Sequence, residues 1–311
     1  MSEAESRNEL DRDVDASMRM FEQSQVGDAL TILPIRPSRV LLVLDGSPQD
    51  DASIAAATTL RERFNTETVV LDAREEIDAD LAGKRAAEVS GSRPIDRGDG
   101  STYDVILAAV ATHDVDLVVL PCPFGRPLDQ VGTDSAGTVI DVLLSRLKTA
   151  MLVIRREDMR LGDCASRVAL VVGGECEMLP LASRWVFGLA NPKATVSLNL
   201  VLEKEAFENM RSIFEAIHPE TPLDEAAFGE AMTKTHASLH GSMAKTARAS
   251  EMNYRLLPQA GEVAPPNPLQ DDERMMLVMP LEVDDRFTQG FVQDRIRRSP
   301  HPVLIVPGHL A

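Results

Sequence analysis

The sequence predicts an α/β protein made of two similar units, each with a parallel sheet of about five strands. Short apolar segments alternate with segments whose apolar residues recur at helical spacing. This alternation occurs twice along the chain, and 311 residues is about twice the length of an average domain. Because helices between successive strands imply crossover connections, the strands of each unit are expected to run parallel.

The first unit begins at Arg39. Its expected strands are apolar runs at residues 39–44, 66–72, 94–97, 115–120 and 151–154. Helical spacing fills the segments between them, at residues 51–64, 79–89, 101–113 and 136–147. The first run, RVLLVL, is almost wholly apolar, which is typical of a strand buried on both faces.

The second unit repeats this order. The segment RVALVVGG at residues 167–174 parallels RVLLVLDG at residues 39–46, and a helix near 180–189 and a strand near 196–202 follow. Residues 274–280 and 303–306 parallel the fourth and fifth strands of the first unit. The second unit is longer before its fourth strand and shorter after it. We expect the additional residues to form helices at about 203–250, and the loss to fall where such sheets face a ligand.

These patterns divide the chain into a tail at residues 1–38, a first domain at 39–158 and a second domain at 165–311. The tail is acidic and polar, with one weak amphipathic pattern at residues 14–23. Such a composition favours a disordered or loosely docked segment.

Composition excludes several classes of function. The net charge of −17 opposes binding to nucleic acid or to anionic membranes. Every apolar run is shorter than the roughly 18 residues that a membrane span needs. Three cysteines without a CxxC pair give neither a disulfide framework nor a zinc site. A reducing, cytoplasmic location is expected.

Candidate ligand-binding residues lie at the ends of the first and fourth strands and at the start of the last helix of the first unit. They are Asp45, Gly46, Ser47, Gly125, Arg126, Gly137 and Thr138. A carboxylate at the end of a strand can accept hydrogen bonds from a ribose or a base. Backbone amides and a hydroxyl at a helix N-terminus suit a phosphate, and Arg126 adds a positive charge. The alternative is ordinary turn and helix-start chemistry.

With these residues in place, both units resemble universal stress protein domains. In that family the first strand ends in Asp-Gly-Ser. The loop after the fourth strand reads Gly-x-x-Gly, nine residues, Gly and Ser or Thr, and a Pro-Val-type strand closes the domain. Asp45-Gly46-Ser47 and Gly137-Thr138 match this order. The resemblance covers nearly all of residues 39–155 and, more loosely, residues 167–307.

The resemblance implies an ATP or AMP pocket in the first domain. Phe124 and Pro127 stand where the family has its first two loop glycines, so a nucleoside or another small ligand stays open. The second domain has Gly173 in place of Asp45 and carries three carboxylates after its fourth strand, which would repel a phosphate. We therefore expect no nucleotide in the second domain.

The family also implies how the domains associate, because the closing strands of its domains pair to form a dimer. Here residues 150–154 and 302–306 are expected to pair within one chain as a pseudo-dimer, since exposed apolar edge strands promote association. A further homodimer stays open.

The leading function is that of a non-enzymatic stress-response or regulatory protein with an adenine-nucleotide site in its first domain. One alternative is a ligand-free scaffold that binds an unknown protein partner through helices 203–250; another is a slow ATPase or other nucleotide-using enzyme. No residue is assigned a catalytic or metal-binding role. His236 and His240 have metal-ligand spacing, but the glutamate of a metallohydrolase motif is missing. Cys122 is expected to be a buried structural thiol.

Overall fold

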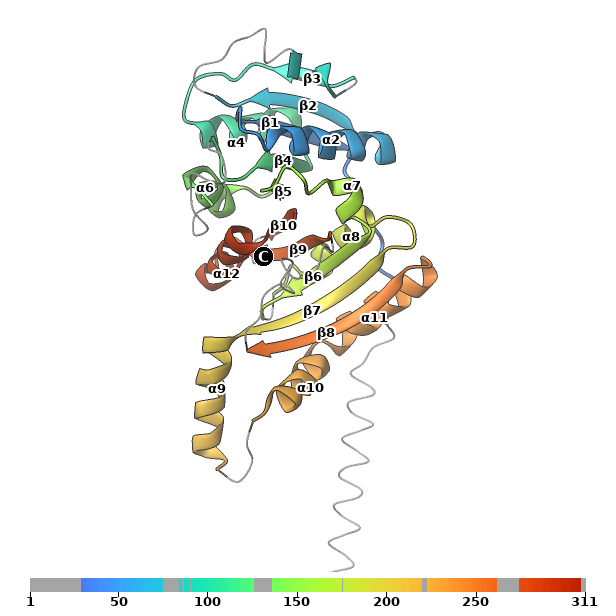
Figure 1. Ribbon diagram of the computed structural model, residues 1–311, viewed down its shortest axis with the longest axis vertical. Coiled ribbons are helices and arrows are strands. Elements are labelled where there is room, and N and C mark those ends of the chain that lie inside the picture. Colours follow the sequence, from blue (N-terminus) through green and yellow to red (C-terminus); the bar gives the residue numbers. More distant parts are fainter. Residues whose placement is uncertain are drawn as a thin grey trace, which may run out of the picture.

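Figure 1 shows the computed structural model, which describes residues 29–74, 84–85, 87–89, 91–125, 136–174, 176–219, 223–261 and 274–308. Within these residues ten strands form one continuous sheet, in the order β3-β2-β1-β4-β5-β10-β9-β6-β7-β8. Neighbouring strands are parallel except β5 and β10, which are antiparallel. The expected mixed α/β class with mostly parallel strands is confirmed.

The first half of the sheet comprises β1 (Arg39–Leu44), β2 (Glu67–Asp72), β3 (Arg93–Ile95), β4 (Leu117–Pro121) and β5 (Ala150–Ile154). Its described helices are α2 (Asp50–Phe64), α4 (Thr102–His113) and α6 (Thr138–Arg146). The hydroxyl of Ser101 caps α4 by accepting from the backbone N–H of Asp104. Most of the helix expected at residues 79–89 lies outside the described residues.

The second half has the same strand order. Its strands are β6 (Arg167–Val172), β7 (Thr195–Glu203), β8 (Asn253–Gly261), β9 (Met276–Glu282) and β10 (Val303–Gly308). Its helices are α8 (Leu179–Leu189), α9 (Lys204–Ile217), α10 (Glu225–Thr235), α11 (Ala237–Ala249) and α12 (Arg286–Arg298), after the short α7 (Leu161–Cys164). Helices α9, α10 and α11 all lie between β7 and β8, within the segment 203–250 where the sequence suggests additional residues.

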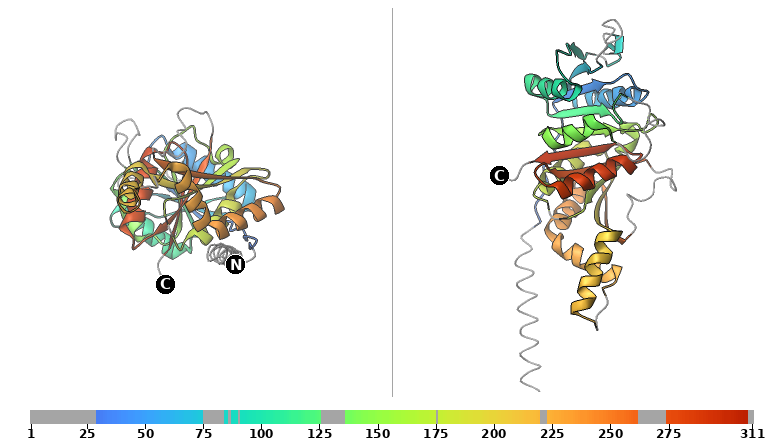
Figure 2. Two further views of the ribbon diagram at one scale, coloured as in Figure 1. Left: turned by 90° about the horizontal axis from the view of Figure 1, so that it is seen from below. Right: turned by 90° about the vertical axis from the view of Figure 1, so that its left-hand side faces the viewer.

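Helices cover both faces of the sheet. Leu60 of α2, Val186 of α8 and Met243 of α11 belong to the apolar core on one face. The right-hand view of Figure 2 faces the other side, where α4, α6 and α12 lie and supply a second core. Among the described residues, none of the helices combines the length and the apolarity that crossing a membrane requires.

The two halves meet at a junction formed by β5 and β10. Leu304 is the register partner of Leu152, and both side chains are fully buried. The buried guanidinium of Arg155 donates hydrogen bonds to the backbone carbonyls of Ile296 and Arg297, at the end of α12. The junction is therefore part of the hydrophobic core and not a contact between separate surfaces.

Residues 29–37 form an extended arm that lies against the second half before the chain enters β1. The backbone N–H of Ile35 donates to the carbonyl of Arg184 over 3.0 Å, and Arg184 Nε donates to the carbonyl of Leu33 over 3.0 Å. A Cβ atom on Gly188 would lie 1.6 Å from the Ile35 carbonyl oxygen, so a glycine is required there. This part of the tail differs from the loosely docked segment expected from its polarity; residues 1–28 lie outside the described residues.

Candidate functional site

The candidate site of the first half lies at the carboxyl ends of β1, β2 and β4, with Asp45 directly after β1; we call this edge of the sheet the first crevice. Asp45 is 5% exposed, and its two oxygens accept backbone hydrogen bonds from different segments. Oδ1 accepts from the N–H of Ser47 over 2.8 Å, and Oδ2 accepts from the N–H of Gly125 in the loop after β4. Asp45 therefore joins the end of β1 to the loop that the sequence marks as the phosphate-binding segment.

Asp50, the first residue of α2, lies beneath this turn. Its carboxylate accepts from the N–H of Asp45 over 3.1 Å and from the N–H of Gly46 over 2.9 Å. Burial, together with the negative charge of Asp45, raises the pKa of Asp50 to about 7. The guanidinium of Arg85 lies 3.8 Å from Asp50 Oδ2 and offsets part of the negative charge of the Asp50 carboxylate.

The raised pKa of Asp50 predicts a stability that depends on pH. Above about pH 4 the unfolded state releases the Asp50 proton, whereas the folded state keeps it until about pH 7. The contribution of Asp50 to the unfolding free energy is therefore fully present below pH 4 and is lost as the pH rises through 7. Asp50→Asn removes the titration. We expect the unfolding free energy of the variant, relative to the wild type, to be higher at pH 8 than at pH 5 by on the order of 2 kcal/mol. Urea unfolding at both pH values measures this; a pH-independent difference would contradict it.

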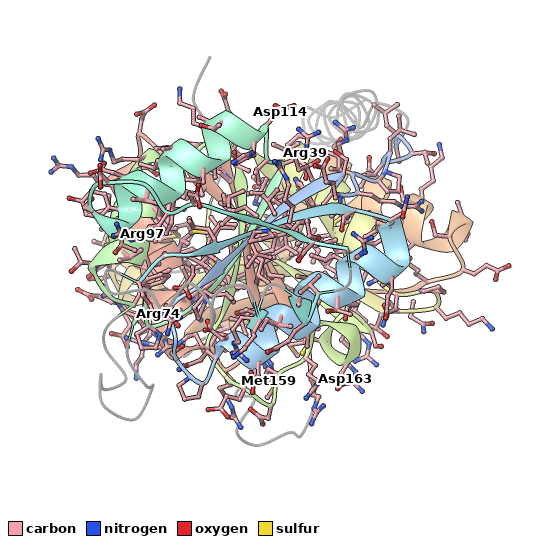
Figure 3. All side chains as sticks on the ribbon, turned by 90° about the horizontal axis from the view of Figure 1, so that it is seen from above. Arg39, Arg74, Arg97, Asp114, Met159 and Asp163 are labelled. Atoms are coloured by element: carbon pink, nitrogen blue, oxygen red, sulfur yellow. The ribbon has the colours of Figure 1, made fainter. Side chains whose placement is uncertain are left out.

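The other side of the first crevice is formed by Asp72 and Arg74. Arg74 Nε donates to Asp72 Oδ1 over 2.8 Å, and its Nη2 pairs with Oδ2. The Arg74 side chain lies over Gly46, where a Cβ would come within 2.8 Å of its Cδ and the φ angle is +79°. Gly46 is therefore needed for both its backbone conformation and the close approach of Arg74. Figure 3 shows Arg74 and Arg97 on the same side of the molecule, away from Arg39 and Asp114.

The loop between β4 and α6 begins and ends at glycines with positive φ, +71° at Gly125 and +88° at Gly137. Its two ends are close, because a Cβ on Gly137 would lie 3.8 Å from the backbone nitrogen of Phe124. Helix α6 begins at the exposed Thr138 without a side-chain cap. Arg126, with the rest of residues 126–135, lies outside the described residues.

The structure therefore joins Asp45, Ser47 and Gly125 by hydrogen bonds and places Gly137 near Phe124. Sequence reasoning did not include Asp50, Asp72 and Arg74 in the site. Asp72 could have been found from the sequence, because it is the last residue of a predicted strand, just as Asp45 directly follows one. The two strands, β2 and β1, are neighbours in the sheet. Asp50 had no such signal, since it reads as an ordinary acidic residue in the first turn of a helix.

The corresponding second crevice, after β6 and β9, is filled by the protein's own side chains. Only residues 283–285 connect β9 to α12, so the long loop is missing. The ring of Phe291 lies 2.9 Å from the position of a Cβ on Gly173, and the remaining cavity is about 40 Å³. Asp285 caps α12 by accepting from the N–H and hydroxyl of Thr288, and Glu282 accepts from the N–H of Glu177 over 2.6 Å. The carboxylates of Asp285 and Glu282 are thus already bound to donors of the protein itself.

The remaining candidate side chains make structural contacts. Cys122 is fully buried, and burial raises the pKa of its thiol to about 12. His240 Nδ1 lies 2.9 Å from the hydroxyl of Tyr254, while His236 is buried between α10 and α11. In the described part of the chain, no group of three or more His, Cys, Asp or Glu side chains is placed to bind a metal ion.

The strand order and the first crevice define a doubly wound α/β protein with the architecture of universal stress proteins. The structure is similar to that of a universal stress protein from Archaeoglobus fulgidus, with a TM-score of 0.52 and 13% identity, over 86% of this chain and 96% of that chain. It is also similar to a functionally unknown protein from Pseudomonas aeruginosa, with a TM-score of 0.56 and 13% identity, over 87% and 92% of the two chains. No family model and no curated protein matches the sequence. The resemblance expected from the sequence is confirmed at the level of the fold.

Proposed function

We propose that this chain is a stress-response protein of the universal stress type, formed by tandem duplication, that binds one adenine nucleotide in its first half. The observation that carries this proposal is the contrast between the two crevices. The first keeps a carboxylate after β1 and a long loop leading to the start of α6 at Thr138. The second has lost the loop, and Phe291 fills its space. The protein then acts by binding the nucleotide in one half only.

The first crevice offers complementary groups for the two ends of a nucleotide. A carboxylate has about four acceptor positions, so Asp45 can bind a ribose or base donor while it keeps its bonds to Ser47 and Gly125. The amides at the start of α6 and the hydroxyl of Thr138 suit the phosphate. A regulatory role is preferred to catalysis, because Asp50, whose pKa of about 7 would suit a general base, is 2% exposed and already accepts two N–H groups.

Thr138→Glu tests this assignment. The new carboxylate would face the phosphate, and at about 4 Å such a repulsion costs on the order of 1–4 kcal/mol, so we expect ATP and AMP affinity to fall at least about fivefold in calorimetric titrations. An acidic residue in the first helical turn does not destabilise α6, and the side chain is exposed.

Thr138→Gln is the uncharged control: it removes the hydroxyl without adding a charge, so it should lower the affinity less than Thr138→Glu does. Adenosine, which has no phosphate, should bind both variants as it binds the wild type. If the glutamate variant binds ATP as well as the glutamine variant, the phosphate does not lie at α6. If the wild type binds none of the three compounds, the nucleotide function is wrong.

A second candidate function, partner binding through the helices between β7 and β8, is favoured by one surface. Met210, Ile213 and Ile217 follow one another at helical spacing on α9 and are 43%, 65% and 67% exposed. Contiguous exposed apolar residues mark interaction sites. Replacing the three by serine should abolish capture of a specific partner from a cell lysate while leaving ATP titrations unchanged; unaltered capture would remove this candidate.

A further inference from the structure

A groove of about 790 Å³ lies on the second half, next to the second crevice, with which it shares Cys176. Its walls are the arm, the start of α8 and the region where α10 passes into α11. Its lining combines polar side chains with apolar ones, which include Leu30, Leu33, Leu179, Pro180 and Leu239. Leu30 and Leu33 are 74% and 70% exposed, so the groove has an open apolar edge.

The arm that forms this edge is held firmly along its length. The N–H of Leu30 donates to Ser242 Oγ over 3.1 Å, and the N–H of Ile32 donates to Thr246 Oγ1 over 2.8 Å. Lys245 Nζ donates to the carbonyl of Ala29 over 2.7 Å. Because Ile32 packs against the core, Leu30 and Leu33 are directed outward by a fixed backbone. The hydrogen bonds of the arm therefore keep these two side chains exposed.

The residues that precede the arm match this groove. Leu10, Val14, Met18 and Phe21 are spaced by four, four and three positions, which would place them on one side of a helix. Gly27 stands two residues before Ala29, where the chain would have to reverse direction to reach the groove. Residues 1–28 are acidic; the groove lining carries one acid, Glu177, and one base, Arg184, and Lys245 lies beside Ala29. The apolar spacing and the position of the segment directly before the arm therefore argue for this occupant.

We propose that residues 10–26 dock in the groove with Leu10, Val14, Met18 and Phe21 facing Leu179 and Leu239. A tethered segment experiences an effective concentration of the order of 1 mM, so even an intrinsic dissociation constant of about 0.1 mM keeps the groove about tenfold more often filled than empty. The segment is thus a tethered occupant of this surface.

Photo-cross-linking of the full chain locates the occupant. Benzoylphenylalanine in place of Phe21, irradiated at low micromolar protein concentration and mapped by mass spectrometry, should form cross-links within one chain to residues 176–184 or 235–242. Cross-links only between chains would make a second copy the occupant. Cross-links elsewhere in the chain, or none at all, would also overturn the proposal.

Hydrogen exchange of the full chain measures how far docking protects the groove. Met18→Asp combined with Phe21→Asp should speed exchange of the amides of residues 235–242 by up to about tenfold, the occupancy ratio given above. Met20→Asp is the matched control, because position 20 lies off the apolar stripe, and should exchange as the wild type does. Equal exchange in the double variant and the wild type would show that the segment does not occupy the groove.

Discussion

Replacing Leu304 by aspartate is expected to destabilise both halves of the protein together. Leu304 lies in the middle of β10, paired with Leu152 across the junction and with Val278 of β9, and none of the three is exposed. A carboxylate there has no charged partner and would cost about 4 kcal/mol or more. For a domain of this size, each kcal/mol lowers the melting temperature by roughly 2–4 °C, so we expect a loss of about 10 °C or more by circular dichroism.

Two further substitutions keep this prediction testable if the aspartate variant does not fold. Leu304→Met preserves volume and should cost less than about 1.5 kcal/mol. Leu304→Ala leaves a cavity and should cost about 2–5 kcal/mol, in a single transition for the whole chain. A melting temperature unchanged by Leu304→Ala, or a first half that melts normally on its own, would show that the junction is not part of a shared core.

Gly188→Ala is expected to destabilise the protein, although alanine is the better helix former. In the middle of a helix, this exchange normally stabilises by about 0.5–1 kcal/mol. Here the added Cβ would lie 1.6 Å from the carbonyl oxygen of Ile35 and 2.6 Å from its carbon, so the arm must move away from α8. The hydrogen bond from Ile35 to Arg184 and the packing of Ile35 are lost. We expect a net loss on the order of 1–3 kcal/mol in urea unfolding.

Gly290→Ala in α12 is the matched control, because no atom lies within 4 Å of its added Cβ. It should stabilise by about 0.5–1 kcal/mol. Thermolysin should cleave residues 30–35 faster in the Gly188 variant and at the wild-type rate in the Gly290 variant. If Gly188→Ala stabilises the protein, the arm does not lie on α8.

The fold class could be predicted from the sequence because the central strands are almost wholly apolar. RVLLVL and RVALVV are β1 and β6, and each lies at the centre of its five-stranded half. The arm could not be predicted, because it has no internal periodicity. Its position depends on Gly188 and on the hydroxyls of Ser242 and Thr246, more than 150 residues away.

Less of the candidate site could be predicted. Asp45 was identified because it follows a strand, but the pKa of Asp50 depends on burial beneath Asp45, which a one-dimensional pattern does not contain. In the second half, the lost loop was visible as a shorter spacing between strands. The occupant of the space was not, because Phe291 reads as one apolar residue of a helix until the sheet brings Gly173 beneath it.

The number of nucleotides bound per chain tests the central proposal most directly. Native mass spectrometry of the full chain, titrated with ATP or AMP, counts bound ligands without assuming where they lie. We predict saturation at one nucleotide per chain in the wild type and clearly lower occupancy, at the same concentrations, in Thr138→Glu. Two nucleotides per chain would contradict the loss of the second site, and none in the wild type would contradict the nucleotide function itself.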